Sequence, residues 1–139
     1  MNFLFAARLL DEGHALARKS WNTEGYIFKD ERGRLQFFDR NEPNVYQPSI
    51  EDTLADDWVE KEKDNWAIVS VTHDLEVMQN KRLVSYHICS KENGKVTNNH
   101  LIDQDELATW SHCVDIDMDQ TAVHLNEQDV AQVKNVLSA

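Results

Sequence analysis

The sequence predicts an α+β fold in which an N-terminal helix packs on a small antiparallel β-sheet, with further strands and a C-terminal helix added. Three observations predict it. Apolar residues recur at helical spacing near both ends of the chain. Short segments rich in β-branched and aromatic residues lie between them, separated by turn residues. At 139 residues, 41% of them apolar, the chain can form one ordinary domain or two very small ones.

The first predicted helix covers residues 2–12, with Asn2 as its cap and Gly13 where a left-handed C-cap belongs. A strand is predicted from His14 to Trp21, and a turn from Asn22 to Gly25. The apolar residues of the predicted helix share one face: Phe3, Ala6, Leu9 and Leu10.

Two short segments, Tyr26–Lys29 and Leu35–Phe38, flank a turn-rich stretch at residues 30–34, which predicts a β-hairpin. Residues 41–44 (Asn-Glu-Pro-Asn) are predicted to be a loop. Together with the first helix, these segments predict a helix packed on a small antiparallel sheet within the first sixty residues.

The stretch from Tyr46 to Trp58 is predicted to end one strand, form a short helix and begin the next strand. Pro48 cannot donate a ladder hydrogen bond and so ends any preceding strand. Ser49 followed by Asp52 three positions later is a capping pair, which predicts the start of a short helix. A strand, residues 58–61, is predicted to begin at Trp58.

A polar run at residues 60–65 is the best candidate for a boundary, giving units 1–62 and 63–139, although the second unit could extend the same sheet. Its predicted elements are strands at 66–71 and 83–89 and a turn at 91–95. A helix capped by Asp103 should bury Leu107 and Trp110. A strand with Val114, Ile116 and Met118 on one face and a final helix follow; that helix is capped by Asn126 and Asp129 and buries Val130, Val133 and Leu137.

The net charge of −11 argues against a general nucleic-acid polymer as partner, because the field of the protein repels phosphate backbones. Basic residues nevertheless concentrate in the first forty positions, so a site for a small anion would lie there. No apolar run approaches the roughly 20 residues that cross a bilayer, and no secretory signal is evident. We therefore expect no membrane partner and a cytoplasmic protein with reduced thiols.

Metal and catalytic sites are weakly supported by the sequence. His87, Cys89, His112 and Cys113 are zinc-type ligands, but their spacing fits no familiar zinc module. The acids at 115–119 imitate a calcium loop that lacks its glycine and its final glutamate. The acids near Asp52 and the hydroxyl of Ser49 have no converging partners. We expect no cofactor, no metal and no catalysis, and hence binding rather than turnover.

Trp21 and Asn22 form the strongest candidate binding site. An indole at a strand end can stack on a purine, and an amide can read the purine edge or a ribose hydroxyl. Core packing for Trp21 and turn formation for Asn22 are the alternatives. Arg18 and Lys19 point to opposite faces of a strand, so at most one of them should meet a phosphate directly.

Two motifs in this chain resemble those of a known family. One is Ser49, Asp52, Leu54, Ala55, Asp57 and Trp58; the other is Ala-Arg-Lys-Ser-Trp-Asn at residues 17–22. Over residues 1–62 the chain resembles the second family of Thoeris anti-defence proteins, small phage and bacterial proteins. That family usually has glycines beside the Trp-Asn pair, whereas this chain has Ser20 and Thr23, and only Gly25 remains nearby.

The resemblance implies a phage-type inhibitor of bacterial anti-phage defence. Such proteins bind cyclic ADP-ribose-type or other cyclic nucleotide signals without cleaving them, as homo-oligomers with pockets between subunits. It implies a basic side chain on the pyrophosphate, an aromatic ring on the adenine, and a ligand-binding set of Arg18, Lys19, Trp21, Asn22, Gly25, Ser49 and Asp52. The alternatives are a protein-binding or assembly module that uses the acidic C-terminal half, a nucleotide enzyme and a small toxin-like protein.

Overall fold

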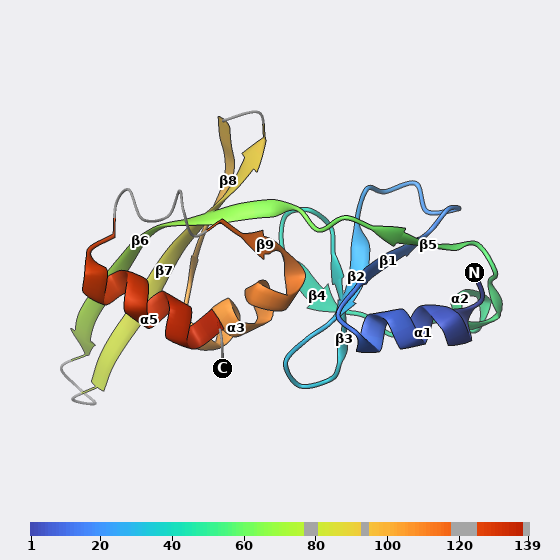
Figure 1. The fold of residues 1–139 in the computed structure, drawn as a ribbon, viewed down its shortest axis with the longest axis horizontal. Coiled ribbons are helices and arrows are strands. Elements are labelled where there is room, and N and C mark those ends of the chain that lie inside the picture. The colour runs from blue at the N-terminus through green and yellow to red at the C-terminus, as the bar shows by residue number, and fades with distance from the viewer. Residues whose placement is uncertain (77–80, 93–94, 118–124, 138–139) are drawn as a thin grey trace. The chain divides into compact units, whose positions relative to one another are not determined.

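The computed structural model describes residues 1–76, 81–92, 95–117 and 125–137, and its chain forms two compact units, Met1–Lys63 and Asp64–Ala139 (Figure 1). Each unit has its own antiparallel strands, and helices flank them. The predicted α+β class, with a helix at each end of the chain, is confirmed.

The first unit is built on a five-stranded antiparallel sheet of order β4-β3-β2-β1-β5. Its strands are short, and the long-range pairing of β1 with β5 adds β5 as an edge strand. The strands are β1 (Ala15–Arg18), β2 (Tyr26–Lys29), β3 (Leu35–Phe38), β4 (Pro43–Val45) and β5 (Trp58–Lys61), with helices α1 (Phe3–Asp11) and α2 (Ile50–Leu54).

Helix α1 covers one face of this sheet, and Figure 1 shows it lying along β1 and β2. Asn2 caps it as predicted, since its side chain accepts from the Phe5 amide at 2.9 Å. Gly13 follows the helix with φ of +96°, the left-handed conformation that glycine adopts without strain. The buried core between helix and sheet consists of Ala6, Leu10, Leu16, Ile27 and Trp58.

The hairpin between β2 and β3 is held by Asp30, of which only 2% is exposed. Its carboxylate accepts from the backbone amides of Arg32 and Arg34, each at 2.9 Å, and from the Gln36 side chain at 2.8 Å. Gly33 takes φ of +77° at the turn. The predicted hairpin is confirmed, and a buried acid with three donors fixes its register.

The second unit contains a four-stranded sheet of order β8-β7-β6-β9, in which β9 runs parallel to β6 and the other pairs are antiparallel. Figure 1 shows its two helices on one side of β6 and β7. The elements are β6 (Asn65–Glu76), β7 (Lys81–Glu92), β8 (Lys95–Ile102), α3 (Gln104–Cys113), β9 (Asp115–Ile116) and α5 (Glu127–Leu137).

Several sequence predictions need correction. The loop predicted at residues 41–44 contains the start of edge strand β4, where Pro43 is tolerated because the first residue of an edge strand need not donate. The strand predicted at 14–21 is shorter, since Lys19 and Ser20 turn out of the sheet. Strand β8 was not predicted. In α5 the buried residues are Val133 and Val136 rather than Val130 and Leu137, which are half-buried.

Two predictions fall on residues outside the described ranges. They are the Asn-Gly turn at residues 93–94 and the position of Met118.

The capped helix after Asp103 is confirmed, because Asp103 accepts from the Glu106 amide at 2.8 Å and Leu107 and Trp110 are buried. The strands after residue 64 form a sheet of their own rather than extending the first one.

Candidate functional site

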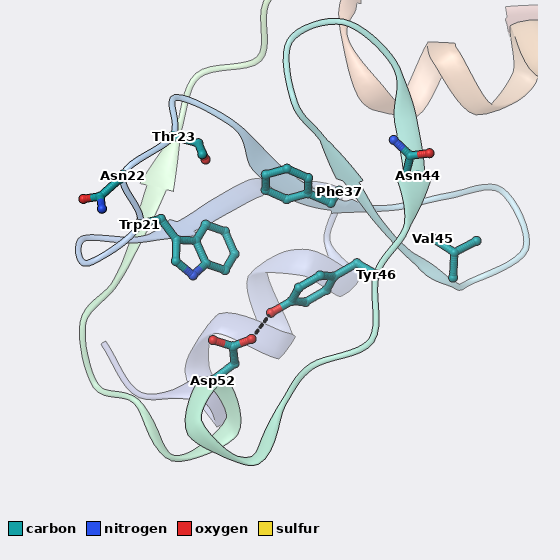
Figure 2. Close-up of a pocket in the computed structure, with 8 residues that line it drawn as sticks. All are labelled: Trp21, Asn22, Thr23, Phe37, Asn44, Val45, Tyr46 and Asp52. Atoms are coloured by element: carbon teal, nitrogen blue, oxygen red, sulfur yellow. Dashed lines mark hydrogen bonds between the residues drawn. The ribbon is translucent and has the colours of Figure 1, made fainter.

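A cavity of about 430 Å³ opens in the first unit between the loop that follows β1, the strands β3 and β4, and helix α2 (Figure 2). Cavities of a few hundred cubic ångströms are the usual size for small-molecule sites. Every residue that lines this one comes from positions 21–52, so the first unit supplies the whole lining.

Three aromatic side chains form the wall of the cavity. Trp21 meets Phe37 edge-on, with ring centroids 5.7 Å apart at 82°, and meets Tyr46 at 6.0 Å and 72°. Behind them the Trp21 indole rests against the buried Trp58, at 5.4 Å and 80°. Edge-to-face contacts of this kind hold each ring in one orientation. The wall is therefore a pre-formed surface against which a planar ligand ring can pack.

Neighbouring strands and turns place these rings. The Trp21 amide donates to the Arg18 carbonyl at 3.1 Å, which turns the chain out of β1 and brings the indole back over the sheet. Tyr46 follows β4, and its amide donates to the Leu35 carbonyl at 3.0 Å, which keeps it beside β3.

Gly25 lies directly behind the Phe37 ring. A Cβ atom at this position would come within 2.6 Å of both the Phe37 ring and the Phe38 carbonyl. Glycine is therefore the residue that lets β3 approach this closely. Gly25 supports the aromatic wall from behind and does not itself line the cavity.

The rim is polar. Asn22 is exposed on the loop after Trp21, and Figure 2 shows its amide turned away from the aromatic rings. The remaining rim residues are Thr23, Asn44 and Val45. Side-chain amides and a hydroxyl at the mouth can donate to and accept from the polar edge of a ligand whose ring enters the cavity.

Asp52 forms the floor of the cavity. One carboxylate oxygen accepts from the Tyr46 hydroxyl at 2.5 Å and the other from Arg18 Nη1 at 2.9 Å. Burial of this carboxyl opposes its ionisation, but the hydrogen bonds from Tyr46 and Arg18 outweigh burial and lower the pKa of Asp52. Burial and the bond to Asp52 raise the pKa of the Tyr46 hydroxyl. The floor is thus a carboxylate joined to a protonated phenol.

The same Asp52 belongs to the helix cap. Its amide donates to the Ser49 hydroxyl at 3.0 Å, and its carboxylate accepts weakly from the Ser49 amide at 3.4 Å. This reciprocal capping box, predicted from the sequence, is confirmed. Its carbonyl accepts from the Trp58 indole at 3.0 Å. The α2 cap therefore fixes the position of the carboxylate.

Arg18 lies behind Asp52 and is bound to two carboxylates. Its Nε donates to Asp57 at 2.8 Å, in addition to the Asp52 bond, and its side chain is 12% exposed. The hydrogen bonds that it donates to Asp57 and then to Asp52 raise the pKa of the guanidinium, and the hydrogen bond from Arg18 is the main reason that the pKa of Asp57 is lowered. Arg18 does not line the cavity, so it holds Asp52 in place rather than facing the open space.

The structure brings part of the sequence-predicted set together. Trp21, Asn22 and Asp52 line the cavity. Arg18 and Ser49 contact Asp52 from behind. Lys19 is exposed outside the lining, and its amide donates to the Asp57 carbonyl at 3.0 Å.

Sequence reasoning missed two of the three aromatic walls, Phe37 and Tyr46, and the rim residues Thr23, Asn44 and Val45. The position of Tyr46 was partly indicated, because this residue begins the stretch from Tyr46 to Trp58 that was identified from the sequence. Phe37 gave none, since strand alternation does not reveal which face of β3 meets the Trp21 loop.

Most basic residues of the first forty positions are paired with acids. Lys29 lies 2.9 Å from Asp11, Arg34 lies 3.4 Å from Asp30, and Arg40 binds Glu24. The expected concentration of cations near the candidate site is therefore largely compensated locally. Within the described ranges, no group of three or more His, Cys, Asp or Glu side chains is arranged to hold a metal ion. Cys89 and Cys113 are both buried.

The lowered pKa values in this unit predict acid sensitivity. Hydrogen bonds lower the pKa of Asp30, Asp52 and Asp57 in the folded state. Their stabilisation is therefore complete above the unfolded-state value of about 3.9 and is lost as pH falls through the lower folded values. We expect the urea midpoint of the first unit, followed by the Trp21 and Trp58 indole NMR signals, to fall as the pH is lowered from about 5 to 2.

The matched control is Asp57→Asn, which removes one of the three carboxyls without touching the cavity lining. Its urea midpoint should change less over the same pH range, because one fewer group binds a proton on unfolding. If the urea midpoint of Asp57→Asn falls as steeply with pH as that of the original protein, the pKa of Asp57 is not lowered in the folded state.

No helix within the part of the chain that the structure describes is long and apolar enough to cross a membrane. No curated protein matches the sequence. A family model does match, over residues 1–60, and this confirms the resemblance seen in the sequence motifs for that segment. The matched segment includes all residues that line the cavity. Residues 1–60 of this chain match the Tad2-like family, the Thoeris anti-defense 2-like domain.

Proposed function

We propose that this protein counteracts a bacterial anti-phage defence by binding a cyclic ADP-ribose-type or related cyclic nucleotide signal in the aromatic cavity and withholding it without cleavage. The family match supports an anti-defence role and, in general terms, a small signal molecule as partner. The cavity walled by Trp21, Phe37 and Tyr46 within the matched segment is the observation that carries the proposal.

The size and the wall of the cavity suit a nucleobase. A volume of about 430 Å³ accepts a base with its sugar. Stacking of a base on an aromatic side chain contributes roughly 1–3 kcal/mol and accepts any base, because every base has a π-face. A protein that only withholds its ligand needs this kind of tight ground-state binding and no complementarity to a transition state.

The lining also favours binding over hydrolysis. The acidic floor residue Asp52 is already bonded to Arg18 and Tyr46, and the lowered pKa of its carboxyl keeps it ionised near neutral pH. A general base works best with a pKa close to the working pH. The arrangement of Asp52 therefore suits a fixed acceptor better than a proton shuttle.

The proposal includes assembly into a homo-oligomer, as the resemblance implies. Helix α2 offers two apolar side chains to such a contact, Ile50 with 80% and Leu54 with 78% of the residue exposed. Native mass spectrometry of the ligand-loaded protein counts subunits and bound ligands together and so tests this part of the proposal.

Calorimetric titration with cyclic ADP-ribose isomers tests the function itself. We expect heat of binding, and recovery of chemically intact ligand after the complex is denatured. Recovery of an altered ligand would replace sequestration with catalysis. Absence of binding to every isomer would refute the proposal and leave a protein-binding module as the better explanation.

A rim substitution gives a first residue-level prediction. Asn22→Ala should weaken binding about three- to tenfold, the effect of losing one hydrogen bond at a partly exposed position, with no change in melting temperature. The matched control is Asn41→Ala, an exposed turn residue outside the lining, which should bind as the original protein does. Equal affinities of the two variants would remove Asn22 from the site.

A further inference from the structure

The charge of the cavity is the opposite of what a phosphate site needs. Of the eight residues that line it, Asp52 is the one with a formal charge at neutral pH. The others contribute aromatic rings, two amides, two hydroxyls and an aliphatic side chain. A phosphate placed at the floor would therefore meet a carboxylate and no cation.

The arginine behind the floor does not reverse this charge. Arg18 faces Asp52 at 2.9 Å, Asp57 at 2.8 Å and Glu51 at 3.8 Å. One positive and three negative charges leave this cluster with a net charge of −2. Arg18 thus neutralises only part of the acidity, and its Nε and Nη1 donate to the two aspartates.

The cavity floor also presents acceptors rather than donors. The Tyr46 hydroxyl proton is committed to Asp52, so the phenol oxygen faces a ligand as an acceptor. A carboxylate has about four lone-pair sites, and in the part of the chain that the structure describes the Asp52 oxygen bound to Arg18 accepts from that group alone. That oxygen can therefore accept from an N–H or O–H group of a ligand.

We infer that Asp52 is the specificity-determining residue of this site: the cavity takes the uncharged, hydrogen-bond-donating end of a nucleotide, its base with the attached ribose, and leaves the phosphates outside the mouth. This inference rests on the proposed function and deepens it. It reverses the expectation that a basic side chain such as Arg18 neutralises the pyrophosphate, and it assigns Arg18 to positioning Asp52.

The discrimination has two physical sources. When a ligand fills the cavity, the Asp52 carboxylate loses the water that it would otherwise bind. A base edge or a ribose hydroxyl replaces that water with a donor, whereas a ligand without a donor leaves the carboxylate unsatisfied and binds more weakly. A phosphate within a few ångströms of Asp52 is repelled at low local dielectric, where screening by salt is weak. Both effects act in the same direction, since each favours the neutral donor end of the ligand.

Adenosine and adenosine 5′-monophosphate are the probes that separate charge from ring stacking. They share the base and the ribose and differ in the phosphate. By calorimetry, the protein should bind adenosine at least as tightly as the monophosphate. Asp52→Asn should weaken adenosine binding about tenfold, equivalent to about 1.4 kcal/mol, and should shift the ratio of the two affinities toward the monophosphate.

Ser49→Ala is the matched control, because it removes the helix cap on Asp52 and keeps the carboxylate. It should leave the ratio of the two affinities unchanged, which separates loss of charge from loss of the cap. Indole NMR signals of Trp21 and Trp58 report whether each variant keeps the fold of the first unit.

Two results would overturn the inference and keep the proposed function. One is monophosphate binding more than tenfold tighter than adenosine in the unsubstituted protein. The other, if only intact cyclic ADP-ribose isomers bind measurably, is an unchanged affinity for them in folded Asp52→Asn. Failure of adenosine, the monophosphate and all cyclic isomers to bind would refute the proposed function together with the inference.

Discussion

Trp58→Ala should unfold the first unit. Trp58 is 1% exposed, and it packs in the core between α1 and the sheet. Its ring lies 5.6 Å from Phe3 and 5.4 Å from Trp21, and its indole donates to the Asp52 carbonyl at 3.0 Å. Truncating a buried tryptophan typically costs about 3–5 kcal/mol. A unit of about sixty residues is marginal at best, so this loss is comparable with its whole stability.

The measurement is the dispersion of backbone amide signals of residues 1–63 in NMR spectra, together with urea unfolding of the original protein. Trp58→Phe is the matched control, because it keeps an aromatic ring in the core and removes the indole hydrogen bond. We expect this variant to stay folded with a loss of about 1–3 kcal/mol, from the cavity and from the lost indole hydrogen bond to the Asp52 carbonyl. Dispersed signals for Trp58→Ala equal to those of the control would contradict the central role of this side chain.

The pairs that cap helices were predictable because both partners stand in the same few residues. Ser49 with Asp52, and Asp103 with Glu106, satisfy helix-end amides through local hydrogen bonds that the spacing alone specifies. Asn126 likewise accepts from the Asp129 amide at 2.8 Å, as predicted. Local hydrogen bonding of this kind does not depend on the rest of the fold.

Long-range partners were not predictable in the same way. Arg18 meets Asp52 and Asp57, which lie 34 and 39 residues further along the chain. Nothing near Arg18 in the sequence indicates those partners, and a solvated or phosphate-bound side chain was the natural expectation. The pairing of β1 with β5 creates this contact, because it sets Arg18 opposite Trp58.

Apolar spacing alone does not define a helical face where a helix is short, and the predicted short helix and the strand that begins at Trp58 are both confirmed. Ile50, Leu54 and Trp58 recur every four residues, yet the first two are exposed and the third is buried. The helix ends at Leu54, and Ala55 is extended with ψ of 149°, so the three side chains do not share one helical face. Strand β8 was missed for a related reason, since Asn98 and Asn99 have low β-propensity and pairing with β7 outweighs it.

Trp21→Ala should abolish most of the ligand affinity. The indole contacts Phe37, Tyr46 and Trp58 and faces the cavity, so it is both the largest wall and the link to the core. Loss of a stacking surface costs roughly 1–3 kcal/mol per base. We expect the dissociation constant for a cyclic ADP-ribose isomer, measured by calorimetry, to rise about five- to 150-fold.

Trp21→Phe is the matched control, because it keeps a flat ring on the loop after β1 and should retain most of the affinity. Trp21 is half-buried, so a melting curve must accompany each titration. Both variants are expected to melt cooperatively, since the core residues Leu16 and Ile27 remain in place. If folded Trp21→Ala binds the ligand as tightly as the unsubstituted protein does, the aromatic cavity is not the ligand site, because this variant removes the one indole that lines the cavity.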